Sequence, residues 1–285
     1  MTNHIGECAL CKENKILKDS HIIPKFVGKW LKRTSITGNI RIAQQPNKRV
    51  QDIIKEYLLC ESCEQKFSSF EKPFAEKIFI PHQEGSKELV YEEWLLKFIV
   101  SLQWRVIVYF KNTATGMSSQ LHYDLEEAQE VFRLYLNDKI DDAGSYSHHL
   151  YLVDTNTKIN GNYDIDGFYT YLLRSIDPTF ITNGESTLSI FTKLPGIIIH
   201  SHITPRNMDG WVNTLVQKQG KIQFPQYNNI SGYDGLIESR IELSHENEIS
   251  TVQRDKINEN IQKNIEKLEK SKSYEAALAD FNNRK

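Results

Sequence analysis

The spacing of apolar side chains along the chain predicts several helices. Between residues 61 and 79, four large apolar side chains recur at intervals of three and four, which places them on one face of a helix: Phe67, Phe70, Phe74 and Ile78. Pro73 lies within this segment and is expected to kink the helix or divide it. Helical spacing also predicts a buried helix over 88–110 and another over 124–138, the latter capped by Asp124.

Short apolar runs in the second half of the chain predict strands. They cover 149–153, 187–192 and 196–202, and this pattern is typical of an antiparallel sheet in an α+β domain. The last segment, 254–285, is mostly polar but carries a narrow apolar stripe: Ile257, Ile261, Ile265 and Leu268. We therefore expect one amphipathic helix there, which docks on the core or pairs with another chain, either a second copy or a different protein.

The composition is that of an ordinary folded protein. Apolar residues make up 39% and charged residues 25% of the 285 residues, which is enough chain to bury a core without disulfides. The first residues show no secretory pattern, and charged residues interrupt the longest apolar stretch. We expect a cytoplasmic protein with no membrane span.

The cysteines form two C-x-x-C pairs in the first quarter of the chain. The pairs are Cys8 with Cys11 and Cys60 with Cys63. Four thiolates suit tetrahedral zinc, and a reducing compartment argues against two disulfides. The long interval between the pairs indicates an element looped out from the centre. We expect a structural zinc ion that holds this segment folded.

Charge is unevenly distributed, although the net charge is only −2. Residues 1–80 hold 14 Lys and Arg against 9 Asp and Glu. One stretch has seven basic residues and no acidic residue: Lys25, Lys29, Lys32, Arg33, Arg41, Lys48 and Arg49. Such a surface suits a polyanion, and we expect these residues to contact nucleic-acid phosphates, with DNA favoured over RNA. The alternative is an ordinary solvated charged face.

Between the cysteine pairs, segments 20–24 and 38–42 are predicted as short strands. The motifs "CALC", "SHIIPKF" and "YLLCESCEQKF" follow one another in this order. Over residues 8–80 this arrangement resembles the zinc-finger-containing branch of the His-Asn-His (HNH), or ββα-metal, endonucleases. It is also similar to bacterial HNH-like proteins with the pattern SHIIPKF…YLLCxxCE.

The resemblance implies an organisation and an activity. It implies a zinc-bound ββα-metal-like nuclease domain over 1–83, followed by a larger α+β domain of recognition or regulatory type over 84–285 with a C-terminal helix. The implied activity is metal-dependent hydrolysis of phosphodiester bonds in nucleic acid. Such nucleases often serve bacterial antiphage defence.

The resemblance also implies roles for individual residues. His21 is the general base that takes a proton from the attacking water. Glu64, directly after the last cysteine, would ligate Mg²⁺ or another divalent cation, with Glu71 or Asp52 as a further ligand. The chain departs from the family where Ser20 replaces the Asp that precedes the base. The middle Asn of the family motif has no clear counterpart.

Three interpretations of the N-terminal segment therefore stay open. It is a metal-dependent nuclease, or a zinc-stabilised module that binds nucleic acid without cutting it, or an interaction protein whose zinc is purely structural. A second histidine motif, His200-Ser201-His202, puts two imidazoles on one face of a predicted strand, where they could bind a metal. Without a nearby cysteine we favour a structural role for these two histidines.

Overall fold

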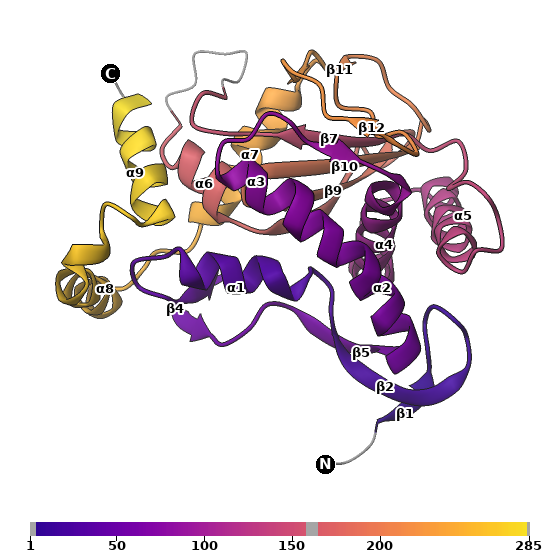
Figure 1. Ribbon diagram of the computed structural model, residues 1–285, viewed down its shortest axis with the longest axis horizontal. Helices are drawn as coiled ribbons and strands as arrows, with labels where there is room; N and C mark the ends of the chain where they lie inside the picture. Colours follow the sequence, from indigo (N-terminus) through magenta and orange to yellow (C-terminus); the bar gives the residue numbers. More distant parts are fainter. Residues whose placement is uncertain (1–3, 158–164, 284–285) are drawn as a thin grey trace.

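The computed structural model describes residues 4–157 and 165–283 and shows an α+β fold. Figure 1 shows a small sheet at the N-terminal end, a larger sheet with helices on both faces, and the last helices of the chain beside them. Four short strands form two further antiparallel pairs: β6 (Val90–Tyr91) with β12 (Gly220–Lys221), and β11 (Trp211–Val212) with β13 (Tyr227–Asn228). Within the described ranges no helix combines the length and apolarity needed to cross a membrane.

The N-terminal sheet joins strands that lie before and after the basic stretch. It has the order β1-β2-β5, and its strands are β1 (Ile5–Glu7), β2 (Asn14–His21) and β5 (Lys55–Cys60). Strand β2 is antiparallel to β5, and α2 (Glu61–Phe74) begins directly after β5. The strand predicted over 20–24 is observed only at its first two residues. Strand β2 ends at His21, and Pro24 occupies the N-cap of the next helix. Proline is tolerated at a helix start because the N–H that it lacks would have no partner within the helix.

The basic stretch folds into a helix and a hairpin. Helix α1 (Lys25–Arg33) buries Val27, Trp30 and Leu31. The strands β3 (Ile40–Ile42) and β4 (Gln45–Val50) pair with each other, and β3 lies within the strand predicted over 38–42. Helix α1 was not predicted because its apolar face is short and its remaining positions are basic.

Proline does not end the helix predicted over 61–79. Helix α2 continues through Pro73 to Phe74, a π-helical turn covers Ala75–Phe79, and α3 (Ile80–Gln83) completes the rod. Proline removes one N–H from the helical ladder, and the wider π-type turn follows at once. The predicted apolar face is buried at Phe67, Phe74 and Ile78, which confirms the helical spacing.

The larger sheet is antiparallel throughout, with the order β7-β10-β9-β8. Its strands are β7 (His148–Leu152), β8 (Asp177–Thr182), β9 (Leu188–Leu194) and β10 (Ile197–Thr204), so three of them confirm the predicted strands. Alternate residues of β10 face opposite sides: Ile197 and Ile199 join the main core, whereas Ile198 joins a second cluster. Burial of both faces explains why these strands read as continuous apolar runs.

Helices cover both faces of this sheet. On one side lie α4 (Glu93–Phe110) and α5 (Ser119–Leu136), and on the other α6 (Phe168–Arg174) and α7 (Tyr233–His245). Helix α5 starts five residues before the predicted cap Asp124. The cap is Ser118, whose hydroxyl accepts a hydrogen bond from the Leu121 amide. Asp124 instead accepts a hydrogen bond from the Thr204 hydroxyl of β10 at 2.6 Å.

The C-terminal segment is not the single helix predicted over 254–285. It forms α8 (Thr251–Lys263), a 3-10 turn (Ile265–Lys267) and α9 (Lys272–Asn283), while residues 284 and 285 lie outside the described part. The apolar stripe is interrupted, since Ile265 is 51% exposed. The chain turns here because it docks on the loop after α1, where the Lys272 amide donates to the Thr34 carbonyl at 3.0 Å.

One hydrophobic core joins the two predicted domains. Its buried side chains run from the cysteine segment through α2, α4 and α5 to the sheet. The boundary near residue 83 stays a prediction, although the core crosses it without interruption.

Candidate metal centre and nucleic-acid interface

The four cysteines come together at one end of the N-terminal sheet. Cys8 and Cys11 lie in the turn between β1 and β2, and Cys60 and Cys63 lie where β5 passes into α2. Their sulfur atoms all lie within 4.8 Å of one another, and the Cys11 and Cys60 Sγ atoms are 3.9 Å apart. With metal–sulfur bonds of about 2.3 Å, a tetrahedral four-thiolate centre has sulfurs about 3.8 Å apart. The cysteines are therefore positioned to bind a metal ion.

The backbone around the centre supports thiolate ligands. The turn carrying the first pair is closed by a hydrogen bond from the Lys12 amide to the Cys8 carbonyl at 2.8 Å. The Cys60 amide donates to the Cys8 sulfur at 3.3 Å. The pKa of Cys8 is lowered to about 4, first by its hydrogen bond with Cys63 and then, against the effect of burial, by backbone amides. The same hydrogen bond, and then burial, raise the pKa of Cys63, so a metal ion has to displace a proton from this pair of sulfurs.

His21, the predicted general base, lies at the end of β2 and pairs with Asp52. The His21 Nε2 atom is 3.1 Å from Asp52 Oδ2, and the His21 side chain is 14% exposed. A carboxylate that accepts from one ring nitrogen leaves the other nitrogen as a proton acceptor. Burial raises the pKa of Asp52, but hydrogen bonds from Lys55 and His21 outweigh it and bring this pKa down to about 2.

Lys55 joins the same group of side chains. Its Nζ lies 3.1 Å from Asp52 Oδ2 and 3.1 Å from Asp19 Oδ2, so one ammonium bridges two carboxylates. Ser20, in the place of the family's Asp, is buried, and its hydroxyl accepts a hydrogen bond from the Leu59 amide of β5 at 3.2 Å. Ser20 therefore fastens β2 to β5.

The predicted cation ligands Glu64 and Glu71 both lie in α2. Glu71 forms an ion pair with Arg105 of α4 at 2.8 Å, and Arg105 also donates to the His21 carbonyl at 3.0 Å. A buried guanidinium needs such partners, so Glu71 is committed to Arg105. Glu64 lies in the first turn of α2. Across the residues that the structure describes, the four cysteines form the one group of three or more potential ligands close enough to share an ion.

The predicted nucleic-acid-binding residues lie on α1 and on the β3–β4 hairpin. Those of α1 recur at helical spacing on its exposed side, opposite Trp30: Lys25, Lys29, Lys32 and Arg33. Lys32 donates to the Gln51 carbonyl, one residue from Asp52. Within residues 4–157 and 165–283, none of the seven predicted cations lies within ion-pair distance of a carboxylate. The surface is positive and uncompensated.

Sequence reasoning did not connect Lys55 or Arg105 with His21. Lys55 carries no motif signal. The position of Arg105 in the sequence is informative. A cation in the middle of a helix that is apolar on nearly all sides must meet a partner inside the protein. The sequence does not show which carboxylate that partner is.

The second histidine motif is part of a buried aromatic cluster. His200 and His202 lie on β10 with ring centroids 4.6 Å apart, and the His149 ring of β7 stacks on Trp211. The Trp211 Nε1–H donates to His202 Nε2 at 2.8 Å, and His202 Nδ1 contacts the Ser189 hydroxyl. Both nitrogens of His202 are therefore occupied. This arrangement favours the structural role.

Acid is expected to unfold the protein well above the range in which carboxylates titrate. Burial first, and nearby imidazoles second, lower the pKa of His148 and His149 from 6.5 to about 3, and burial lowers that of His202 to about 4. Since only the unfolded chain takes up these protons, the stabilisation is complete above pH 6.5 and is lost as pH falls toward 4. At pH 5 each histidine costs about 2 kcal/mol, so three remove about 6 of a typical 5–15 kcal/mol.

Urea unfolding between pH 7.5 and 5 measures this decrease. Removal of one titrating group by His148→Gln should reduce the slope of the unfolding free energy by about 1.4 kcal/mol per pH unit. The exposed His122 provides the control, and His122→Gln should leave the slope unchanged. A stability that stays flat from pH 7.5 to 5 would refute the burial of neutral imidazoles.

Comparison of the chain with protein-family models, with curated proteins and with solved structures found no match.

Proposed function

We propose that the protein is a nuclease that binds nucleic acid through α1 and the β3–β4 hairpin and hydrolyses a phosphodiester bond at His21. The ion at the four cysteines is zinc, because tetrahedral sites built from two C-x-x-C pairs are typical of zinc. The zinc is structural: all four of its positions are filled by protein, which leaves none for water or substrate.

One observation carries the proposal: a cationic surface without carboxylate partners adjoins a histidine held by a carboxylate. Fixed cations that lack internal partners attract phosphates, and release of counterions from the polyanion drives the binding. Lys32 connects the two parts, because its ammonium bonds to the Gln51 carbonyl beside Asp52. A phosphodiester bound along α1 therefore lies near His21.

The chemistry follows from the tautomer of His21. Asp52 accepts the Nε2–H, so Nδ1 is available to take a proton from a water molecule. The water oxygen then attacks phosphorus as the bond to the leaving oxygen breaks, the leaving oxygen takes a proton from solvent water, and His21 returns its proton to solvent. The cations of α1 would stabilise the negative charge that develops on the phosphate.

The carboxylates beside His21 do not fit a resident divalent cation in this conformation. Asp19 and Asp52 share the Lys55 ammonium, and Glu71 is held by Arg105. We therefore route no step through such an ion, and a cation held by Glu64 stays a prediction. The same geometry favours a second candidate function, binding without cleavage, because an ammonium occupies the position between the carboxylates.

Cleavage separates the two candidates. Plasmid DNA and a structured RNA are incubated with the full chain in Mg²⁺, Mn²⁺ or Ni²⁺, and in EDTA. Cleavage supports the nuclease and reports its substrate and its ion, and salt-sensitive binding without cleavage in any condition supports the binding module. Absence of both would overturn the proposal.

Reversing three cations of α1 should abolish most nucleic-acid binding. Lys25, Lys29 and Arg33 are exposed, and the described residues offer their side chains no hydrogen-bond or ion-pair partner, so their change to Glu should preserve the fold. We expect the slope of log K against log salt to fall by about 1 for each phosphate that the variant no longer neutralises. Fluorescence anisotropy with a labelled duplex across a salt series measures both quantities.

The control carries the same change of net charge elsewhere. Lys139, Lys218 and Lys221 are exposed cations outside α1 and the β3–β4 hairpin, and their reversal to Glu should leave the affinity almost unchanged. Equal reductions in affinity for the two triple variants would show that binding follows net charge rather than α1.

A further inference from the structure

The β3–β4 hairpin brings two arginines directly opposite each other. Arg41 and Arg49 are cross-strand partners, and like charges in this position destabilise a hairpin. Arg41 is held by the Pro46 carbonyl and by Gln253 of α8, at 3.2 Å from the amide oxygen. For Arg49 the described part of the chain offers no hydrogen-bond or ion-pair partner. Two guanidinium groups are thus kept together without an anion.

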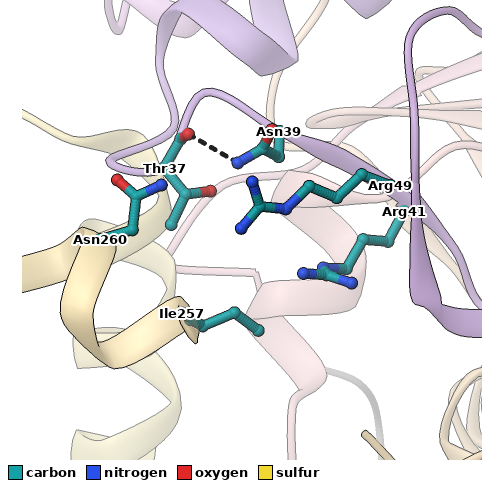
Figure 2. Close-up of a pocket in the computed structure, with 6 residues that line it drawn as sticks. All are labelled: Thr37, Asn39, Arg41, Arg49, Ile257 and Asn260. Carbon is teal, nitrogen blue, oxygen red and sulfur yellow. Dashed lines mark hydrogen bonds between the residues drawn. The ribbon is translucent and has the colours of Figure 1, made fainter. Parts of the chain in front are cut away.

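The two arginines line a pocket between the β3–β4 hairpin and helix α8. Its cavity measures about 260 Å³, and the other walls are Thr37, Asn39, Ile257 and Asn260. Figure 2 shows both guanidinium groups directed into the space enclosed by Thr37, Asn260 and Ile257. This volume is below that of pockets for drug-sized ligands and suits a small polar group.

The amide side chains in the wall are arranged to present donors. Asn264 Nδ2 donates to Asn260 Oδ1 at 2.9 Å, which leaves the Asn260 Nδ2 free to donate toward the arginines (Figure 2). Asn39 Nδ2 bonds to the Thr37 carbonyl at 2.9 Å and fixes the loop, as the dashed line in Figure 2 shows. No carboxylate lines the cavity. The wall is therefore rich in donors and lacks negative charge.

The electrostatic repulsion between Arg41 and Arg49 also favours an anion in the pocket. Burial first, and the charge of Arg49 second, lower the pKa of Arg41. Arginine nevertheless stays charged at neutral pH, so the repulsion persists. A bound anion would offset it and satisfy the planar donor sets of both side chains.

We propose that this pocket binds one phosphate group, carried by a nucleotide or by a nucleic-acid strand. Paired guanidinium groups match the tetrahedral oxygens of phosphate, and the cavity admits the group with its adjoining sugar. The proposal deepens the nucleic-acid function and rests on it for the strand as a source, but not for a free nucleotide. The ligand joins the hairpin to α8, two segments more than two hundred residues apart in the sequence.

The test measures binding of inorganic phosphate and AMP to the full chain by calorimetry, at constant ionic strength. Arg49→Gln should weaken both by about ten- to a hundredfold, the effect of removing charged hydrogen bonds. The same variant should raise the melting temperature of the ligand-free protein, because it removes the repulsion from Arg41. Lys218→Gln removes one exposed charge outside both the pocket and α1, and it should change neither quantity.

A second arm identifies the source of the phosphate. A 12-nucleotide single strand is titrated with and without a 5′-phosphate, into the wild type and into Arg49→Gln. Weakening confined to the 5′-phosphorylated strand and AMP assigns a terminal phosphate, whereas equal weakening for both strands assigns a backbone phosphate. If the wild type binds AMP but neither strand, the pocket stands and the proposed nucleic-acid function falls. If Arg49→Gln and Lys218→Gln bind every probe alike, the pocket proposal is overturned.

Discussion

Replacement of Cys60 by Ser is expected to release the metal and unfold the N-terminal part of the protein. Cys60 joins β5 to α2, and its amide also bonds to the Cys8 sulfur. Zinc at a four-thiolate site contributes roughly 10–16 kcal/mol, which equals or exceeds the whole stability of a typical domain. No other interaction described for the β1–β2 turn has this size. Circular-dichroism melting and elemental analysis of the purified variant measure the effect.

The control for this substitution is its neighbour. Ser62 is exposed and its hydroxyl lies 3.3 Å from the Cys60 sulfur, so Ser62→Ala perturbs the centre without removing a ligand. This variant should keep one zinc per chain and melt within a few degrees of the wild type. A wild-type protein without metal, or a Cys60→Ser protein of unchanged melting temperature, would contradict a structural zinc.

Removal of the His21 imidazole should abolish cleavage and leave the fold intact. His21→Ala deletes the predicted general base, and we expect the rate to fall by roughly 10²–10⁴-fold. The backbone carbonyl that Arg105 binds is still present in the variant, so the connection to α4 survives. Zinc content, melting temperature and nucleic-acid affinity should therefore change little. Rates with saturating substrate separate this effect from binding.

Two further variants make the result specific. His122→Ala removes an exposed imidazole and should cleave like the wild type. Asp52→Asn keeps the size of the side chain but removes the carboxylate that orients the ring, so it should lower the rate by less than His21→Ala does. Full cleavage by a folded His21→Ala protein would move the active site elsewhere. A large drop in its melting temperature would instead identify His21 as a structural residue.

Short-range signals in the sequence predicted the parts of the molecule that depend on them. The two C-x-x-C pairs predicted a four-cysteine cluster, because four thiols in one small segment have few other uses. Apolar spacing predicted α2, α4 and three strands of the larger sheet, where burial decides the pattern. The predicted start of α5 at Asp124 was wrong, because the hydroxyl of Ser118 caps this helix earlier in the chain.

The pattern of apolar and polar residues could not predict contacts between distant segments of the chain. The helix predicted over the last thirty residues divides because its chain bonds to the loop at Thr34, which no local signal reveals. Glu71 satisfies the periodicity of a metal ligand as well as that of an ion-pair partner, and only the position of Arg105 decides between them. The pocket of Arg41 and Arg49 likewise needs α8 for its wall.

The ties of Arg105 make the cysteine segment a poor candidate for transplantation. Its guanidinium enters from α4 and bonds both to the carbonyl of His21 and to Glu71. Phe67 and Phe74 pack against Trp104 and Phe98 of the same helix. A fusion protein carrying residues 1–83 alone would expose these rings and leave the His21 strand end without its anchor. Gene shuffling would exchange the cysteine segment only together with α4, so the two are inherited as one piece.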